Sequence, residues 1–548
     1  MYTKLLDFLV ADTPRSKLWL VIMSIICGFI NALIVVILNV AAKGFGKPEL
    51  DARLFILFLL CIGLYFFCKR YISHRLSRLV QSSIFHYRHR ILSALRDLKL
   101  LSYEEIGKVP ILSVLSEKTE VIMQGAHRLA EGFPAFIMLI CSFTYIASIS
   151  NMALLLSVIC IACSVISSQI MLKSMYITMQ QAIEKDKEYL GYMQHLLDGF
   201  NELKMNRNKS DDLCDNYMGH ILDESLKKNM ETDISIVNLQ LYSQNYFYLL
   251  MASIVFVLPQ LTQITGNEVM AITTTILYMM GPLAVVLDMA PSLAKANVAI
   301  EFLKNLDDKL YSAKESLTDE MSVFHAPLYF DQLVVQQVEF SYPRRDQEKV
   351  FAVGPFNFQI NRGELIFIRG GNGSGKSTFL KLLTGLYQAD SGAIVVDGHE
   401  IDNRLLNNYR NLFAIVFTDF HLFDRFYGLQ HIDAKVVKDY IKLMGLENKT
   451  SYKNGRFTNT SLSTGQKKRL ALIFSLIEDK SIYVFDEVAA DQDPEFRQFF
   501  YEIILQKLKS MGKTVIVVTH DEKYFDRGDR LFVMNKGLLL EETPQPNS

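Results

Sequence analysis

The sequence carries little charge for its length. Asp, Glu, Lys and Arg make up 21% of its 548 residues, whereas 50% of the residues are hydrophobic. A disordered chain has much charge and few apolar side chains, so this composition excludes that class. It is also too apolar for a typical soluble protein. The formal net charge is −1, so no basic excess indicates a protein that binds nucleic acid.

Cysteine is scarce as well. Seven cysteines in a chain of this length do not form the disulfide framework of a small secreted domain. Six of them lie in or at the edge of apolar runs, where cysteine behaves as a small hydrophobic side chain: Cys27, Cys61, Cys68, Cys141, Cys160 and Cys163. The fold therefore depends on where the apolar residues are gathered.

Six apolar segments occupy the first half of the chain. A membrane-spanning helix needs about 20 predominantly apolar residues. Segments near 18–42, 54–72, 133–150, 152–172, 240–261 and 269–291 reach or approach this length. One such segment could be a buried core helix, but six in this order, with charges at their ends, predict a membrane domain. The first is also longer than the apolar part of a cleaved signal peptide.

The distribution of Lys and Arg predicts the orientation in the bilayer. Segment 69–132 holds 11 of them and segment 173–235 holds 8, whereas the connections at 151 and 262–268 hold none. Cytoplasmic connections carry the excess of positive charge. We therefore expect a multi-pass protein with both long segments, both termini and any soluble domain in the cytoplasm.

The two long connections are themselves informative. They contain 64 and 63 residues, and neither is rich in proline or glycine. A helix rises about 1.5 Å per residue, so each connection can form a helical hairpin about 45 Å long. We predict an elbow near 105–118 in the first and near 205–212 in the second. The alternative is a pair of soluble loops.

The second half has a different pattern. Short Val, Ile and Phe runs alternate with turns and amphipathic stretches, which is typical of an α/β domain. We therefore predict an all-α, six-helix transmembrane domain at 1–325, with long cytoplasmic helical extensions. An α/β P-loop ATPase domain is predicted at 326–548.

A phosphate-binding loop lies near the start of the second domain. The run Gly370-Gly371-Asn372-Gly373-Ser374-Gly375-Lys376-Ser377 fits G-x-x-x-x-G-K-[ST] between a predicted strand and a predicted helix. Glycines let backbone N–H groups surround phosphate oxygens, and the helix N-terminus adds partial positive charge. We expect Lys376 to bridge the β- and γ-phosphates of ATP and Ser377 Oγ to ligate Mg²⁺.

An apolar strand at 482–485 ends in Asp486 and Glu487. A carboxylate at a strand end suits Mg²⁺ or its water, which we assign to Asp486. Glu487 suits the general base that polarises the attacking water. Alone, such a strand is usually structural, but here it follows the P-loop by about 110 residues, as in P-loop ATPases.

A third motif follows the P-loop and precedes this strand. Leu462-Ser463-Thr464-Gly465-Gln466 leads into a basic and then an apolar run, which predicts a loop that enters a helix capped by Ser463. Together with the P-loop and the Asp-Glu strand, it resembles the signature of the ATP-binding cassette (ABC) family. The six-span domain ahead of it resembles an ABC exporter half-transporter. The resemblance covers essentially the whole chain.

The resemblance implies the roles of further residues. Tyr342 resembles the aromatic residue that stacks on adenine, the alternative being a buried tyrosine of the sheet. His520 resembles the switch histidine at the γ-phosphate, and Asp493 aligns with the D-loop aspartate. The implied catalytic residues are Glu487, His520 and Lys376. The implied ATP ligands are Tyr342, Asn372, Gly373, Gly375, Lys376, Ser377, Thr378, Ser463, Gly465 and Gln466.

One position departs from the family pattern. Thr418 stands where the Q-loop usually has glutamine. Threonine is shorter and reaches Mg²⁺ only through water or a backbone shift, with Asp419 as an alternative oxygen. The expected Mg²⁺ ligands are therefore Ser377 and Asp486, with Thr418 in doubt.

The resemblance also implies an assembly and a cargo. ATP in this family lies between the P-loop of one cassette and the signature of another, which implies a homodimer. The wording of the cassette at 370–378, 383–387, 416–419 and 489–494 is similar to the bacterial cyclic-peptide and siderophore exporters, a group that includes lasso-peptide microcin and pyoverdine-type exporters. It implies ATP-driven export of a small peptide or siderophore across the inner membrane by alternating access.

Two alternatives stay open. A lipid or glycolipid flippase has the same architecture. An ATP-gated channel or sensor usually has a degenerate catalytic site, whereas Glu487 and His520 are both present. Five polar residues in or near the spans either bind cargo or form helix–helix hydrogen bonds, and we assign none of them as a cargo ligand: Asn31, Asn39, Gln240, Gln244 and Asp288.

Overall fold

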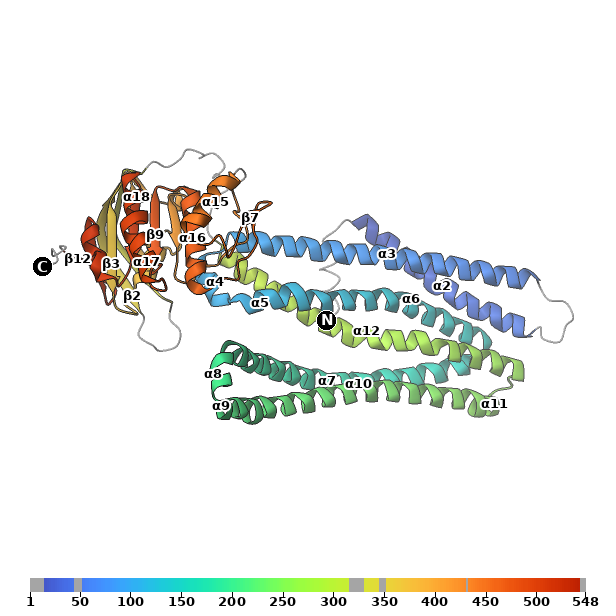
Figure 1. Cartoon of the computed structure of the whole chain (residues 1–548). Coiled ribbons are helices and arrows are strands. Elements are labelled where there is room, and N and C mark those ends of the chain that lie inside the picture. The colour runs from blue at the N-terminus through green and yellow to red at the C-terminus, as the bar shows by residue number, and fades with distance from the viewer. Residues whose placement is uncertain (1–13, 44–51, 315–329, 344–350, 430–431, 543–548) are drawn as a thin grey trace. The chain divides into compact units, whose positions relative to one another are not determined.

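A computed structural model describes residues 14–43, 52–314, 330–343, 351–429 and 432–542 (Figure 1). The chain forms two compact units. One comprises Met1–Ser93 and Lys108–Lys309, and the other Ala94–Gly107 and Leu310–Ser548. The domain border predicted at 325/326 lies outside the described residues. The sequence did not indicate that a short piece of the first connection belongs to the second unit.

Long helices build the first unit. Short π-helical turns at Val114–Lys118, Asp212–Met218 and Ser253–Val257 continue one helix into the next. The helices of this unit, and the residues they cover, are α2 Pro14–Lys43, α3 Ala52–Arg96, α5 Lys108–Ser113, α6 Thr119–Ile149, α7 Asn151–Asp198, α8 Phe200–Met205, α9 Arg207–Asp211, α10 Gly219–Ala252, α11 Leu258–Leu261 and α12 Gly266–Ser312.

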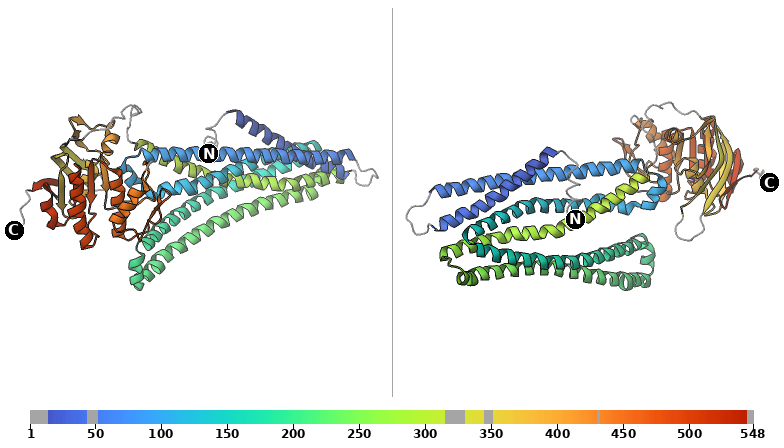
Figure 2. Two further views of the ribbon diagram at one scale, coloured as in Figure 1. Left: turned by 45° about the horizontal axis from the view of Figure 1, so that its top comes forward. Right: turned by 180° about the vertical axis from the view of Figure 1, so that it is seen from behind.

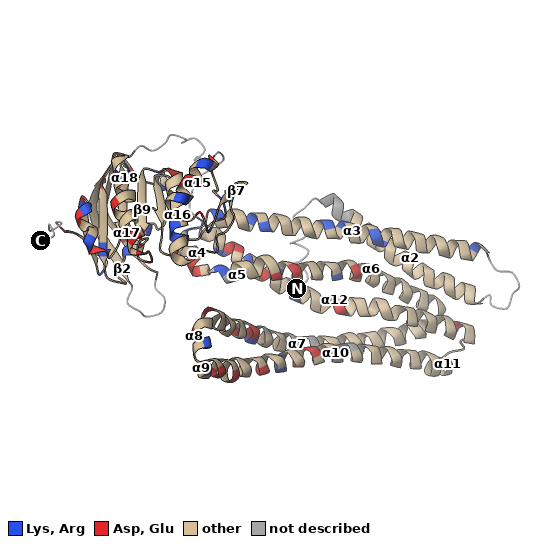
Figure 3. Cartoon of the chain, in the orientation of Figure 1, with Lys and Arg blue, Asp and Glu red and all other residues tan. Residues whose placement is uncertain are grey.

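Six helical stretches of the described residues are long and apolar enough to cross a membrane. They are Trp19–Ala42, Ala52–Arg96, Pro110–Ile149, Asn151–Met171, Arg207–Leu261 and Gly266–Ser312. Charged side chains are sparse at the end of the helices near α11 and more frequent toward α8 and α9 (Figure 3). The six predicted spans are therefore confirmed, and several continue well beyond the apolar segment.

Both long connections are helical, so the alternative of soluble loops is wrong. α7 and α10 lie side by side along the unit, joined through α8 and α9 (Figures 1 and 2). Gly199 ends α7 at this second elbow. In the first connection α3 runs to Arg96, and Gly107, with a φ of 76°, separates α4, Leu100–Ile106, from α5. The first elbow thus begins earlier than 105–118.

Two of the five polar span residues join helices. Asn39 Nδ2 donates to Thr275 Oγ1 at 3.0 Å and to the Ala271 carbonyl at 3.2 Å. Tyr278 OH donates to Asn31 Oδ1 at 3.2 Å. A polar side chain surrounded by lipid-facing helices is stabilised by such a bond between helices. Both asparagines on α2 therefore act in packing against α12.

Three sheets build the second unit. A sheet of four strands has the order β2-β1-β4-β5, a sheet of six has the order β12-β11-β3-β10-β9-β6, and β7 pairs with β8. In the six-stranded sheet only β12 is antiparallel to its neighbour. The strands are β1 Gln332–Ser341, β2 Ala352–Asn361, β3 Leu365–Gly370, β4 Ser391–Val396, β5 His399–Glu400, β6 Phe413–Val416, β7 Tyr452–Lys453, β8 Arg456–Phe457, β9 Ile482–Asp486, β10 Thr514–Val518, β11 Arg530–Asn535 and β12 Leu538–Glu542.

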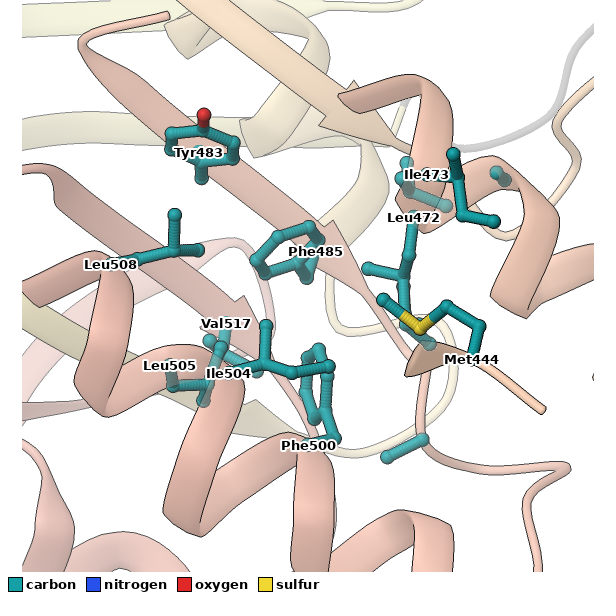
Figure 4. Close-up of a cluster of buried hydrophobic side chains, with 14 of the residues drawn as sticks. Met444, Leu472, Ile473, Tyr483, Phe485, Phe500, Ile504, Leu505, Leu508 and Val517 are labelled. Atoms are coloured by element: carbon teal, nitrogen blue, oxygen red, sulfur yellow. The ribbon is translucent and has the colours of Figure 1, made fainter. Parts of the chain in front are cut away.

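Helices cover both faces of the six-stranded sheet. They are α13 Lys376–Leu383, α14 Leu406–Arg410, α15 Ala434–Leu443, α16 Thr464–Glu478, α17 Pro494–Phe499 and α18 Leu505–Ser510. Successive strand residues point to opposite faces. Tyr483 and Phe485 accordingly join the core under α15 to α18 (Figure 4), whereas Ile482 and Val484 join the core that includes α13. Burial on both faces explains why β9 is apolar up to its last residue, Asp486.

Candidate nucleotide-binding site

The P-loop connects β3 to α13 and has a backbone shape that requires glycine. Gly373 and Gly375 have φ values of 73° and 108°, a region that costs energy for residues with a Cβ. Lys376 is 7% exposed, and its Nζ donates to the carbonyls of Gly370 at 2.7 Å and Gly371 at 3.2 Å. The ammonium group is therefore held over the loop, where we expect the phosphates.

Glu487 lies between the other two residues predicted as catalytic. Its Oε1 is 3.8 Å from Lys376 Nζ and 3.5 Å from His520 Nε2. Because β9 and β10 are parallel neighbours, the residues that follow each strand meet at one edge of the sheet. Glu487 has a φ of 52°, which is uncommon for a residue with a side chain. The fold thus brings together three residues that are distant in sequence.

The turn that carries His520 is anchored on both sides. Tyr501 OH shares a hydrogen bond with Thr519 Oγ1 at 2.6 Å and donates to Asp521 Oδ2 at 2.9 Å. Arg497 also pairs with Asp521, at 3.2 Å. Burial raises the pKa of Tyr501, so its phenol stays protonated and remains a donor. His520 itself is half exposed and free to meet a ligand.

Asp486 ends β9 as a buried carboxyl group, 3% exposed. Burial raises the pKa of Asp486, and a hydrogen bond from Thr418 opposes this. Thr418 Oγ1 also lies 3.3 Å from the Asp486 backbone carbonyl, to which it donates. The threonine at the predicted Q-loop position therefore lies beside Asp486, and its contact with a metal stays a prediction.

The side chains predicted to ligate Mg²⁺ carry oxygens of a suitable kind. A hydroxyl, a carboxylate and a second hydroxyl, from Ser377, Asp486 and Thr418, are hard donors of the kind that Mg²⁺ accepts alongside phosphates. Within the described ranges, no group of three or more His, Cys, Asp or Glu could hold a metal by itself. The ion, when bound with ATP, would neutralise phosphate charge.

Tyr342 follows β1 and is half-buried rather than enclosed in the sheet. Its ring lies 5.1 Å from that of Phe340 and 6.0 Å from that of Tyr387. Its hydroxyl shares a hydrogen bond of 2.9 Å with Thr378 Oγ1, at the start of α13. Tyr342 also lines a cleft of about 580 Å³. The ring is therefore accessible to a planar base and connected to the P-loop helix.

The signature residues form the start of α16. Ser463 and Gln466 make a capping box, in which each side chain accepts a hydrogen bond from the other residue's backbone N–H. A Cβ at Gly465 would lie 2.8 Å from the Asp491 carbonyl, and Gln492 Nε2 donates to the Gly465 carbonyl at 2.9 Å. No hydrogen bond or ion pair between described residues joins this segment to the P-loop. Its contacts are with the D-loop instead.

Asp493, aligned with the D-loop aspartate, has a local structural role. Its carboxylate accepts the Phe496 N–H at 2.8 Å and so caps α17. It also pairs with Arg469 of α16. The bond from Phe496, followed by the charge of Arg469, lowers the pKa of Asp493. The aspartate thus helps to hold α17 against α16.

Lys468 was not predicted as a site residue, although the structure places it beside the turn that carries Glu487. Its side chain is 4% exposed, and its Nζ donates to the Glu487 backbone carbonyl at 2.8 Å and pairs with Asp491 at 2.7 Å. The Glu487 N–H donates to the Val518 carbonyl at 3.0 Å. Both backbone groups of the strained Glu487 are therefore bound. The only signal in the sequence was the basic run after the signature.

We expect Lys468→Met to lower the kcat of ATP hydrolysis roughly 10- to 100-fold, because a small displacement of Glu487 misplaces the general base. The KM for ATP should change much less, since Lys468 is not a predicted ligand. Steady-state phosphate release measures both constants. Lys467→Met alters the exposed neighbour and should leave them unchanged. A wild-type kcat in folded Lys468→Met protein would contradict this positioning role.

Comparison with known proteins identifies the cassette. Residues 353–490 match the family model of the ABC transporter. The chain is 35% identical over 302 residues to ATP-binding protein SyrD of Pseudomonas syringae pv. syringae, covering 54% of this chain and 53% of that one. It is 31% identical to the lipoprotein-releasing system ATP-binding protein LolD of Treponema denticola, covering 35% of this chain and 91% of that one.

Two further similarities bear on the architecture. The chain is 30% identical over 225 residues to an ATP-dependent lipid A-core flippase of Vibrio cholerae, covering 38% of this chain and 37% of that one. The structure of a bacterial Atm1-family ABC exporter with ATP bound superimposes with a TM-score of 0.77 at 18% identity, covering 97% of this chain and 96% of that one. The chain spans about half the length of SyrD. The full-length similarity is therefore one of fold.

Proposed function

Since this chain belongs to the ABC transporter family, we propose that it is a homodimeric half-transporter that exports a small or cyclic peptide or a siderophore across the bacterial inner membrane. Six apolar helices and an ABC ATPase domain lie in one chain. The observation that carries the proposal is the assembled group of Lys376, Glu487 and His520 in that cassette. Alternating access is driven by ATP binding and hydrolysis.

The geometry supports hydrolysis through Glu487. The oxygen of a water attacks the γ-phosphorus, the bond from γ-phosphorus to the β–γ bridging oxygen breaks, and ADP and inorganic phosphate form. Glu487 accepts the proton of the attacking water. Lys376 stabilises the charge on the β- and γ-phosphates, and His520 contacts the γ-phosphate.

Two features support a homodimer. Gly465 contacts its own D-loop and Ser463 bonds to Gln466, and neither bonds to its own P-loop among the described residues, so both are available to the ATP of a second cassette. On α10, Leu222, Leu226 and Met230 form an exposed apolar stripe with side chains 45%, 59% and 52% exposed. This stripe precedes the apolar span at 240–261 and therefore lies outside the bilayer. In a single chain its apolar side chains would be exposed to water. A second copy of the chain is the occupant we propose.

The assignment of a peptide cargo rests on the amino-acid sequence of the cassette motifs, which resembles that of cyclic-peptide and siderophore exporters. The similarity to a lipid A-core flippase favours a lipid as the second candidate cargo. The purified dimer in nanodiscs should show ATPase activity that rises with small cyclic peptides or hydroxamate siderophores. Uptake of the same compounds into inverted vesicles tests transport. Stimulation by lipid A alone would favour the flippase.

The first elbow is attached to the cassette. Glu104 of α4 accepts a hydrogen bond from Tyr387 OH at 2.5 Å and pairs with Lys381 of α13 at 2.8 Å. Burial raises the pKa of Tyr387, and the bond to Glu104 raises it further, which keeps the phenol a donor. Leu100 and Leu101 pack against the apolar core around α13. Because α13 begins at the P-loop, we propose that α4 carries conformational change from the ATP site to the spans.

We expect Glu104→Gln to reduce peptide-stimulated ATPase activity roughly twofold to fivefold, because the charge that pairs with Lys381 is lost at a partly exposed site. Basal activity should stay near the wild-type rate, since no predicted ATP ligand changes. Glu105→Gln alters the exposed neighbour on the same helix and serves as the control. Equal stimulation of all three proteins would contradict coupling through Glu104.

A further inference from the structure

A cavity of about 270 Å³ lies in the membrane unit between α10 and α12. Most of its wall is apolar, with Phe247 from α10 and Met280, Leu283 and Leu287 from α12. Two polar side chains join them, Gln244 from α10 and Asp288 from α12. The cavity therefore combines an apolar interior with a carboxylate and an amide.

Asp288 is isolated among apolar residues. It is the first charged residue of α12 after Glu268, and α10 carries no charge after Asp233. In the part of the chain that the structure describes, no hydrogen bond or ion pair reaches its carboxylate. Among the described residues that line the cavity, Asp288 is also the only one with a charged side chain. Ionisable groups within membrane spans are costly, so they usually pair with one another or act on a ligand.

Other oxygen acceptors lie beside it. Gln244 adds an amide oxygen on the facing helix. Pro291 lies inside α12 and has no N–H, so the Leu287 carbonyl lacks the donor that an ordinary helix supplies four residues later. The described residues of the cavity wall thus offer acceptors and a negative charge, but no cation.

We propose that this cavity binds one positively charged side chain of the exported peptide, an amine or a guanidinium, with Asp288 as its counter-ion. The volume suits a single large side chain and is too small for a whole cyclic peptide. The apolar wall contacts the stem of that side chain, while Gln244 accepts one of its hydrogen bonds. This inference rests on the proposed peptide export and adds the charge of the cargo.

Binding of three labelled cyclic peptides tests the proposal. They are identical except for one position, which holds lysine, norleucine or glutamate, and they carry an uncharged fluorophore. With the full-length dimer in nanodiscs, fluorescence anisotropy should show the lysine peptide bound roughly tenfold more tightly than the norleucine peptide. The glutamate peptide should bind most weakly. Asp288→Asn should remove the preference for lysine, and Asp288→Glu should keep most of it.

The controls separate this site from the export function. Asp308→Asn changes an exposed carboxylate elsewhere on α12 and should keep the preference for lysine. Gln244→Leu should weaken binding of the lysine peptide while the charge of Asp288 stays intact. This variant replaces Asp288→Asn as the test if Asp288→Asn does not fold. Equal binding of the three peptides to wild type, or an unchanged preference in both variants, overturns the cation site. Vesicle uptake of the norleucine peptide would still support export, whereas failure of all three peptides to bind would refute both proposals.

Discussion

Glu487→Gln is expected to lower the rate of ATP hydrolysis by at least about 100-fold, because glutamine cannot accept the proton of the attacking water. Glutamine has the size of glutamate, so the side chains around it should keep their positions. In the structure, Lys376 Nζ lies 3.8 Å and His520 Nε2 3.5 Å from Glu487 Oε1. ATP binding should therefore persist. Phosphate release measures the loss of hydrolysis, and ATP retained after gel filtration measures occupancy.

Glu487→Gln also tests whether ATP is bound between the P-loop of one cassette and the signature of the other. If hydrolysis releases the two cassettes, Glu487→Gln should hold the dimer closed around ATP, so that retained nucleotide approaches one ATP per chain. Glu495→Gln changes an exposed glutamate in the first turn of α17 and should hydrolyse ATP at the wild-type rate. Wild-type hydrolysis by Glu487→Gln would remove Glu487 as general base. Complete loss of ATP retention would instead indicate a damaged site.

Lys376→Ala should weaken ATP binding by about 100-fold, because it removes a charge-assisted contact with two phosphates. The effect differs in kind from that of Glu487→Gln, since binding is lost along with hydrolysis. Lys376 is nearly buried and bonds to the carbonyls of Gly370 and Gly371. Its removal also leaves these two loop carbonyls without their donor. Titration with a fluorescent ATP analogue measures the affinity.

A control distinguishes loss of the ligand contact from loss of fold. Thermal unfolding without nucleotide should change little in Lys376→Ala, whereas the stabilisation by added ATP should largely disappear. Lys435→Ala, on the exposed surface of α15, should behave as wild type in both measurements. An unchanged ATP affinity in Lys376→Ala would refute the assignment of the P-loop lysine.

Much of the fold could be predicted because the relevant patterns are local. Apolar runs long enough to cross a bilayer lie in consecutive residues, and all six spans appear in the structure. The long helical hairpins followed from the low Pro and Gly content of the connections between spans, and Gly107 and Gly199 mark their elbows. The first elbow was placed too late along the chain, because nothing in the local pattern shows that α4 packs on the cassette.

The site was predictable to the extent that its residues belong to short motifs. The P-loop, the Asp486-Glu487 pair and the capped start of α16 are each read within a few residues. The roles of Lys468 and Glu104 were not visible, because each acts on residues far away in sequence. An isolated lysine or glutamate in a helix is usually a solvated surface residue, and only its partners show otherwise.

The low content of charged residues also shows which features local sequence predicts and which depend on tertiary structure. By itself the sequence determined a six-span membrane half and an ABC ATPase half, because hydropathy and phosphate-binding motifs depend on neighbouring residues. Tertiary structure alone decided that Asn39 joins two helices, whereas Asp288 faces a cavity and its carboxylate has no partner among the described residues. The physical reason is that Asn39 and Asp288 look alike in the sequence, since both are polar side chains in apolar helices. Their free energy is set by which acceptors, donors and charges the facing helix brings within reach.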